Sequence, residues 1–310
     1  MKIRLGTRAS TLARTQSGWV ADQIQQMHPE VSVEEVLIET VGDQDQKTPL
    51  HEVGAPGVFT VEVERALAEG EVDLAVHSLK DLPIVQPPEL VIAAIPPRED
   101  PRDAWVSARY PGLVDVPPGA TVATGSLRRS CQILHRYPHL VVEGIRGNVE
   151  TRLRVYEERG DAGVVLACAG LHRLALKDTI RCAISTTEVT PAPAQGALAV
   201  EIRSDDSALA EVVGFLDDPI TRICVEAERE LLGALGGGCH LPVGALGVVS
   251  GEHLSLCGVL GLPDGSRLVR LGLEGSVTSS REIGQQLAKM IRKAGGDEIL
   301  QILDESLGLG

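Results

Sequence analysis

Aromatic residues are scarce in this chain of 310 residues: Phe, Trp and Tyr together make up only 2% of it. Its hydrophobic cores must therefore be built from Val, Leu, Ile and Ala, a profile typical of helices packed on mostly parallel sheets. Because hydrophobic residues still amount to 43%, the chain can bury the cores of two or three domains of ordinary size.

The chain also lacks a Cys-x-x-Cys pair, a membrane-length apolar run and an apolar segment at its start. Without paired cysteines, a zinc site is not expected, and we predict no bound metal. Residues 2–6 already form a strand pattern, so neither a secretion signal nor a membrane span is predicted. A reducing cytoplasm with free thiols is the simplest expectation. The six cysteines are Cys131, Cys168, Cys182, Cys224, Cys239 and Cys257.

Positive charge is the third deficit, since the net charge is −14. A broad nucleic-acid surface needs a basic face, so nucleic-acid binding is not expected. Lys is rare among the cations and Arg is common, and Arg makes planar two-point contacts with carboxylates. A genome that favours Arg codons would give the same bias, so the positions of the arginines decide its meaning.

Strand and helix patterns alternate over the first two thirds of the chain, which is typical of βαβ units. The expected strands are 2–6, 33–39, 73–76, 121–124, 140–143, 163–168 and 197–202. The expected helices begin at Ser10 and Ser126 and span 58–69 and 148–159. Gln16 falls on the apolar stripe of the first helix, either as a core amide or facing a cleft.

Stiff or charged segments at 96–103, 190–196 and 217–219 mark the expected domain boundaries. We predict two similar, doubly wound α/β lobes and a small C-terminal α+β domain. The first lobe spans 1–97 and 197–216, the second spans 102–192, and the last domain spans 219–310.

The last domain reads as a small antiparallel sheet with helical cover. Its expected strands lie near 243–249, 253–260 and 267–274, with a hairpin turn at 263–266. A capping box formed by Ser279 and Glu282 predicts the start of a helix that stops at Gly295.

The two lobes echo each other. Segments 6–10 and 124–129 both lie where a strand turns into a helix, and Lys80 and Arg173 follow buried strands at comparable offsets. Ligands bind α/β sheets at the carboxyl ends of the strands, and helix N-termini favour anions. We therefore expect a cleft between the lobes that binds a multiply anionic ligand.

Arginines gather at two helix starts of the second lobe. Arg128 and Arg129 lie in a first helical turn, where cations oppose the helix dipole unless an anion is near. Arg146 precedes Gly147, which allows close backbone approach, and Asn148 is a plausible N-cap. A solvated surface pair is the alternative for Arg128 and Arg129, as surface decoration is for Arg152.

Two other segments carry reactive groups. Lys80 and Asp81 follow a buried strand, as an exposed ion pair or, inside a cleft, as a carboxylate that moves protons or stabilises a cation. Three glycines precede Cys239 and expose its thiol, which favours a covalent role over a structural one.

In this order and over essentially the whole chain, these motifs resemble the porphobilinogen deaminase (hydroxymethylbilane synthase) family. The matching segments are Arg8-x-Ser10, 77–83, 98–103, 126–129, 146–152, 169–173, Gln195-Gly196 and the loop with Cys239. The resemblance implies two lobes like the periplasmic binding-protein fold and a third domain that carries the cysteine.

The resemblance also implies the chemistry. Four porphobilinogen units are joined head to tail with loss of ammonia, and water releases hydroxymethylbilane for haem, chlorophyll and cobalamin synthesis. A dipyrromethane primer is thioether-linked to the cysteine that maps onto Cys239, and the catalytic carboxylate maps onto Asp81. Each pyrrole bears acetate and propionate arms, which explains many arginines in an acidic protein. A cytoplasmic monomer is expected.

The resemblance assigns binding roles to further positions. Those expected at the cofactor are Cys239, Arg128, Arg129, Arg146, Ser126, Lys80 and Asp81. Those expected at the substrate are Arg8, Ser10, Gln16, Arg152, Arg173, Gln195 and Phe59. The sequence does not decide which arginines serve the primer and which the incoming unit. Segment 56–61 keeps Phe59 but lacks both lysines of the Lys-Gly-x-Phe-x-Lys pattern that many members carry.

Two other functions fit parts of the pattern. A two-lobed anion-binding protein would need no reactive thiol and would usually carry a signal segment. A phosphate-handling transferase would need a Gly-rich phosphate loop with its Lys, which the sequence lacks.

Overall fold

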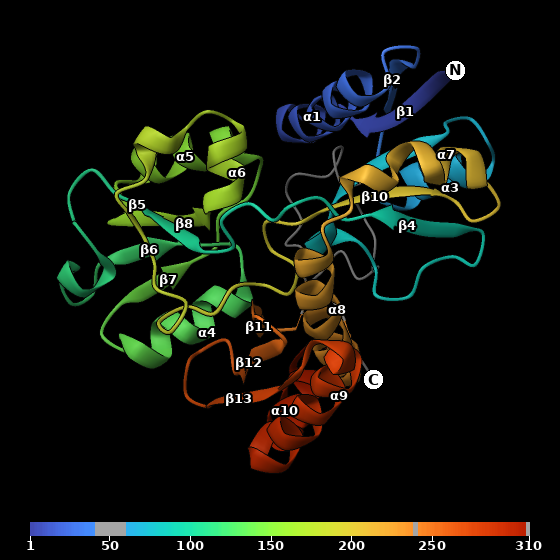
Figure 1. Cartoon of the computed structure of the whole chain (residues 1–310). Helices are drawn as coiled ribbons and strands as arrows, with labels where there is room; N and C mark the ends of the chain where they lie inside the picture. The colour runs from blue at the N-terminus through green and yellow to red at the C-terminus, as the bar shows by residue number, and fades with distance from the viewer. Residues whose placement is uncertain (41–59, 238–240, 308–310) are drawn as a thin grey trace. The chain divides into compact units, whose positions relative to one another are not determined.

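The computed structural model of the chain describes residues 1–40, 60–237 and 241–307 (Figure 1). These residues form two compact units. Described residues up to 99, together with 196–222, form the first unit, and 100–195 with 223–307 form the second. Across these described ranges, no helix is both long and apolar enough to cross a membrane.

The first unit is built on a mixed sheet with strand order β2-β1-β3-β10-β4 among the described residues. β1 lies parallel to β2 and β3, whereas β10 is antiparallel to both β3 and β4. Helices α1 and α7 pack on one face of the sheet and α3 on the other. The strands are β1 (Lys2–Arg8), β2 (Ser32–Ile38), β3 (Leu74–Ser78), β4 (Leu90–Ala94) and β10 (Leu198–Arg203). The helices are α1 (Thr11–Met27), α3 (Val61–Ala68), the 3-10 turn η1 (Leu79–Asp81), α7 (Ser207–Val213) and η4 (Gly214–Leu216).

The second unit contains a sheet of the same design, with strand order β7-β6-β8-β5-β9. β6 lies parallel to β7 and β8, and β5 is antiparallel to β8 and β9. Helix α4 packs on one face, and α5 and α6 pack on the other. The strands are β5 (Asp103–Val106), β6 (Thr121–Ala123), β7 (Val141–Glu143), β8 (Gly163–Ala167) and β9 (Cys182–Ala183). The helices are η2 (Leu113–Asp115), α4 (Leu127–Arg136), α5 (Val149–Arg159), α6 (Cys168–Arg173) and η3 (Lys177–Thr179).

Equal strand orders confirm the predicted echo between the lobes. β1 and β6 occupy the same place in their sheets, and each leads into a helix, at Thr11 and at Leu127. β3 and β8 also correspond, and they lead to Lys80 and to Arg173. The expectation of mostly parallel sheets was wrong in one respect, because an antiparallel strand is inserted in each sheet.

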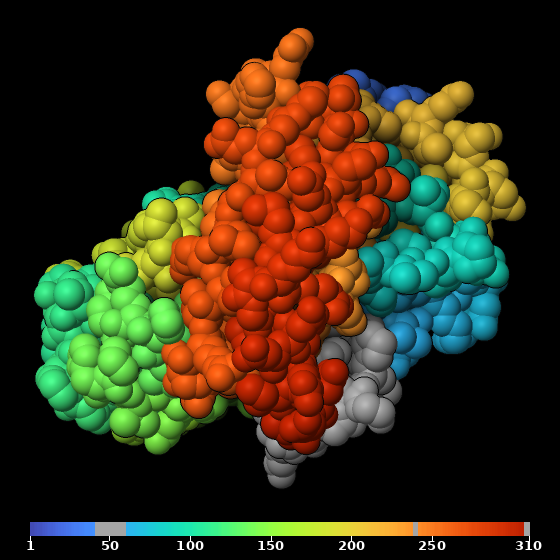
Figure 2. Space-filling view, turned by 90° about the horizontal axis from the view of Figure 1, so that it is seen from below, coloured from blue at the N-terminus to red at the C-terminus, as the bar shows by residue number. Residues whose placement is uncertain are grey.

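The second unit also carries the predicted antiparallel sheet, in the order β11-β12-β13. Its strands are β11 (Val243–Ser250), β12 (His253–Gly261) and β13 (Leu268–Ser276). Helices α8 (Pro219–Ala234), α9 (Ser280–Ile291) and α10 (Asp297–Leu307) supply its cover, with η5 (Val277–Ser279) and η6 (Arg292–Gly296) beside α9. In Figure 2 the residues of α9 and α10 form one continuous surface in red.

Several elements departed from the sequence predictions. Pro219 begins α8 instead of marking only a boundary, because Pro is tolerated at a first helical position. Ser279 is the N-cap of α9, but its side chain makes no capping hydrogen bond, so the capping box is not formed. Gly295, at φ 106°, does interrupt the helix as predicted, but α10 follows it and was missed.

Candidate active site

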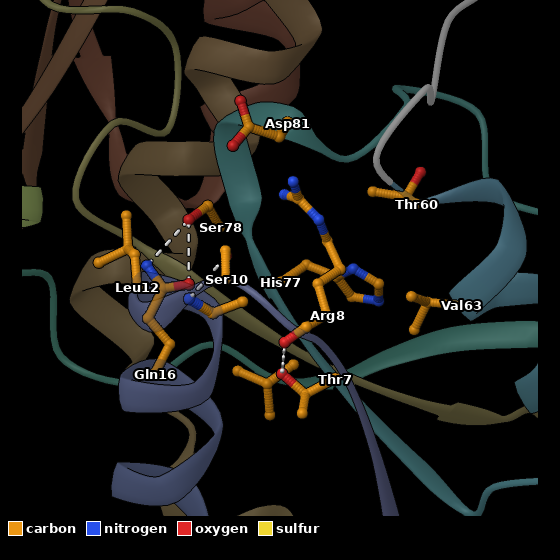
Figure 3. Close-up of a pocket in the computed structure, with 12 residues that line it drawn as sticks. Thr7, Arg8, Ser10, Leu12, Gln16, Thr60, Val63, His77, Ser78 and Asp81 are labelled. Atoms are coloured by element: carbon orange, nitrogen blue, oxygen red, sulfur yellow. Dashed lines mark hydrogen bonds between the residues drawn. The ribbon is translucent and has the colours of Figure 1, made fainter. Parts of the chain in front are cut away.

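A small pocket lies at the carboxyl ends of β1 and β3 in the first unit (Figure 3). It encloses about 80 Å³. Seven polar residues of its lining come from β1, the start of α1, β3 and η1: Thr7, Arg8, Ser10, Gln16, His77, Ser78 and Asp81. This is the end of the sheet at which α/β folds bind ligands.

Ser10 and Gln16 of the pocket belong to the start of α1. Ser10 is the N-cap, and its hydroxyl accepts a hydrogen bond from Ala13 N at 3.3 Å. Gln16 is 4% exposed, and its Nε2 donates to the Ser78 hydroxyl at 2.9 Å. Both readings of Gln16 therefore hold, because it is a satisfied buried amide that also lines the pocket.

Asp81 is the acidic group of this pocket. It ends η1, directly after β3, and its side chain is exposed. In Figure 3 the Arg8 guanidinium points into the same space from β1. Lys80 is half-buried beside Asp81. A carboxylate and a guanidinium thus share one pocket, an arrangement that can hold a substrate with both an anionic arm and a developing cation.

Asp103 organises the candidate site of the second unit. It begins β5 and is completely buried. Its carboxylate accepts hydrogen bonds from Arg128 Nη1 at 2.7 Å and Arg129 Nη2 at 2.7 Å. Gln195 Nε2 donates to the same carboxylate at 2.9 Å. Three residues predicted at the site are therefore gathered around one carboxylate that the sequence analysis did not single out.

Burial would raise the pKa of the Asp103 carboxyl, but the Arg128 and Arg129 guanidiniums hold that pKa far below its usual range. Both arginines are also buried, at 4% and 5% exposure. Two guanidiniums against one carboxylate leave one positive charge in excess. The anion expected near the start of α4 is thus supplied by the protein itself, as the Asp103 carboxylate.

Arg146 and Gly147 lie before α5. Arg146 Nε is buried and has no hydrogen-bond partner among the described residues, which is costly for a charged donor unless a ligand accepts from it. Gly147 has φ 100°, and a Cβ there would lie 2.6 Å from the Thr151 side chain. The next residue, Asn148, is the N-cap as predicted and accepts from Thr151 N at 2.8 Å. Arg152 Nε donates to Gly147 O at 2.8 Å, so this arginine braces the turn.

Of the remaining predicted residues, two lie at helix ends and two lie outside the described residues. Ser126 is the N-cap of α4, and its side chain makes no capping hydrogen bond. Arg173 is the last residue of α6. Phe59 and Cys239 lie outside the described residues, as does segment 43–57.

Sequence reasoning missed three buried acids or bases: Asp103, His77 and Glu201. The Arg128-Arg129 pair did signal a nearby anion, but nothing in the local sequence located that anion at Asp103, 25 residues earlier. His77 and Glu201 contact each other across 124 residues, a separation that no local motif encodes.

Comparisons with known proteins agree over the whole chain. The family model "Porphobilinogen deaminase, dipyromethane cofactor binding domain" matches residues 3–211, and "Porphobilinogen deaminase, C-terminal domain" matches residues 222–293. The porphobilinogen deaminase of Syntrophotalea carbinolica is 44% identical over 97% of this chain and 96% of its own. That of Acidothermus cellulolyticus is 45% identical over 96% of this chain and 91% of its own.

Solved structures of binding proteins are also similar, at lower identity. A methionine-binding protein aligns with 69% of this chain and 89% of its own at a TM-score of 0.44 and 12% identity. A periplasmic solute-binding protein from Desulfovibrio salexigens aligns with 70% of this chain and 72% of its own, at a TM-score of 0.43 and 11% identity. The fold of this chain is defined by its own strand orders and helix positions.

Proposed function

The chain belongs to the porphobilinogen deaminase family, and from this premise we propose how its own residues serve the reaction. The enzyme is a hydroxymethylbilane synthase, a transferase that polymerises porphobilinogen in tetrapyrrole synthesis. It works with a dipyrromethane cofactor. The proposal concerns which residues bind the cofactor, which bind porphobilinogen and which carry the chemistry.

The second unit offers groups that fit a dipyrromethane. The carboxylate arms of this cofactor would suit the excess positive charge at Arg128 and Arg129 and the unpartnered buried Nε of Arg146. Ser126 and Lys80 are proposed alongside them. When bound, the cofactor supplies the primer to which porphobilinogen units are added.

Cys239 is the proposed point of attachment. Burial raises the pKa of Cys131 and of Cys168 to about 12, so those two thiols are poor nucleophiles. Burial also raises the pKa of Cys182. These shifts favour a cysteine in the glycine loop over the cysteines of the strands and helices.

Asp81 is the proposed catalytic carboxylate, and its exposed position in a pocket with Arg8 is the observation that carries this assignment. Loss of ammonia from porphobilinogen leaves a cationic azafulvene. A carboxylate next to that cation lowers the barrier to its formation and can accept the pyrrole N–H proton. Arg8 would hold an acid arm of the substrate in the same pocket.

Other residues are proposed to hold the substrate or the growing chain. Ser10 and Gln16 line the pocket with Arg8, and Arg152 braces the turn that follows Arg146. Residues proposed with them are Arg173, Gln195 and Phe59.

The substitution Asp81→Ala tests the catalytic assignment. Because Asp81 is exposed, its loss should leave folding and primer attachment unchanged while turnover falls by about 10²-fold or more. The measurement is steady-state turnover together with the intact mass of the same preparation. Turnover near that of the wild type would remove Asp81 from the mechanism.

We further propose that the enzyme acts as a monomer in the cytoplasm. Five of its cysteines are free thiols in the structure, which suits a reducing compartment. The proposed domain division is 1–97 with 197–216, then 102–192, then 219–310.

A further inference from the structure

A buried hydrogen-bonded pair of side chains lies at the pocket of the first unit. His77, near the end of β3, places Nε2 3.1 Å from Glu201 Oε2 on β10. The two side chains are 5% and 0% exposed. His77 lines the pocket that contains Asp81, so this pair is the buried wall of the proposed substrate site.

Strand register explains why the two side chains meet. β3 and β10 are antiparallel, with His77 opposite Ala199 and Ala75 opposite Glu201. His77 and Glu201 are therefore diagonal neighbours on one face of the sheet, within reach of long side chains. Each faces an alanine, which leaves room for the larger polar group.

Glu64 adds a second buried carboxylate. It lies on α3, the helix that covers this face of the sheet, and it is 6% exposed. Burial raises the pKa of the Glu64 carboxyl, a hydrogen bond from the Thr60 hydroxyl opposes that rise, and the charge of Glu201 adds to it. The pKa of the Glu64 carboxyl is thus held above its ordinary value, which favours the protonated form.

Two carboxylate oxygens in this cluster have no partner within the described part of the chain. They are Glu64 Oε1 and Glu201 Oε1, and both are buried. An ionised carboxylate with an unsatisfied buried oxygen is unfavourable, so a proton held within the cluster lowers its free energy.

Both ends of this cluster reach the pocket. His77 lines the pocket directly, and Thr60, which donates to Glu64, lines it as well (Figure 3). The other charged groups of the pocket lining are Arg8 on β1 and Asp81 on η1. A proton can therefore enter or leave through His77 on one side and through the Thr60 hydroxyl on the other.

Each condensation moves protons and must balance them. The C–N bond of the aminomethyl group breaks and its electron pair leaves with ammonia. One C–C bond forms, and the C–H bond at the attacked chain's free pyrrole carbon breaks, with its electron pair kept by the ring. The proton released from carbon goes to a base, and ammonia takes up a proton to leave as ammonium. A group that holds one proton between its release from carbon and its uptake by ammonia would serve both steps.

We propose that His77, Glu201 and Glu64 form a proton store that serves the pocket of Asp81 during each condensation. The proposal rests on the proposed role of that pocket. His77 is the member that exchanges protons with the pocket, because its side chain lines that pocket. Glu201 holds the imidazole in place, and Glu64 supplies the second proton-binding position. All three act as positioning residues.

The test uses the holoenzyme with His77→Gln and Glu201→Gln, since each amide keeps a hydrogen-bonding side chain of similar size and cannot carry the charge. His28→Gln, in the same unit but paired with Glu30 outside the pocket, is the control. For His77→Gln we expect kcat to fall about tenfold or more, KM to stay within about twofold, and the pH dependence of kcat to flatten. The control should match the wild type in all three.

The double variant decides whether the residues act together. If they form one store, His77→Gln with Glu201→Gln should be no slower than the slower single variant. Multiplied losses, or a loss of kcat that is equal at every pH, would overturn the proposal and leave a structural role. If Asp81→Ala abolishes turnover while His77→Gln retains wild-type kcat and pH profile, the store is wrong and the pocket stands. If neither variant loses turnover, the proposed function of the pocket fails as well.

Discussion

Arg128 and Asp103 form a buried, two-point ion pair, with Nη1–Oδ2 at 2.7 Å and Nη2–Oδ1 at 3.2 Å. The same Arg128 Nη1 donates to Thr190 O at 2.7 Å. The guanidinium is therefore held at fixed points without a ligand, which is the preorganisation that the proposed cofactor site requires.

Removing the charge of Asp103 should damage both stability and cofactor binding. Asp103→Asn would leave Arg128 and Arg129 buried side by side without their counter-ion, and breaking such a pair costs about 3–5 kcal/mol. We expect a lower free energy of unfolding in urea and a smaller fraction of chains that carry the primer. Glu158→Gln, which breaks the exposed pair with Arg154, is the control and should cost under about 0.5 kcal/mol. Equal losses in the two variants would contradict the central place of Asp103.

Glu64 should make the folded protein less stable as pH rises, the opposite of the usual effect of a carboxyl group. Because its pKa is raised in the folded protein, its stabilising contribution is present below the carboxyl range of the unfolded chain and is lost as pH rises through the raised value. Glu64→Gln removes that loss. In urea unfolding from about pH 4 to pH 8, we expect the variant to gain stability relative to the wild type as pH rises. If the difference in free energy of unfolding between the variant and the wild type stays constant with pH, the pKa of Glu64 is not raised in the folded protein.

Arg146 should matter through its unpartnered Nε. A charge-assisted hydrogen bond to a cofactor or substrate carboxylate contributes about 1.5–3 kcal/mol, so Arg146→Leu should slow primer assembly or elongation by roughly 10–150-fold. Arg154→Leu on α5 is the matched control, since the Arg154 side chain is 62% exposed and forms an exposed ion pair with Glu158. Wild-type rates for Arg146→Leu would count against the arginine site.

Thiol chemistry should separate Cys239 from the other cysteines. The raised pKa of about 12 for Cys131 and Cys168 makes their thiolate fraction at pH 8 roughly one in 10⁴, so neither should label in the folded protein. In denaturant all free thiols become accessible. A thiol reagent should then count five groups instead of the six in the sequence, because Cys239 stays blocked by the primer. Six reactive thiols would mean that no thioether exists.

The sequence predicted the parts of the fold that depend on short-range patterns. The βαβ repeats and the N-cap at Asn148 follow from residues near one another in the chain. The comparable offsets expected for Lys80 and Arg173 were wrong, because Lys80 lies in the turn η1 directly after β3 and Arg173 lies at the end of α6. Strand β10 was predicted as 197–202, but its antiparallel direction was not, and β5 was missed. The antiparallel pairing of both strands joins segments far apart in sequence.

The residues of the candidate site also divide into those that local motifs predicted and those that depend on pairing between distant segments. Arg128, Arg129 and Asp81 could be chosen from local motifs, whereas the carboxylate between the arginines could not. Asp103 begins a strand directly after a Pro- and charge-rich segment that reads as a linker. Glu201 reads as one polar residue in an apolar strand until β10 is placed beside His77.

The intact mass of the purified protein tests the central claim most directly. The account predicts a single species heavier than the printed sequence by one dipyrromethane, with the added mass on the peptide that contains Cys239. Cys239→Ser should give the bare sequence mass. An active wild-type enzyme with the bare mass, or with the added mass on another residue, would contradict the account.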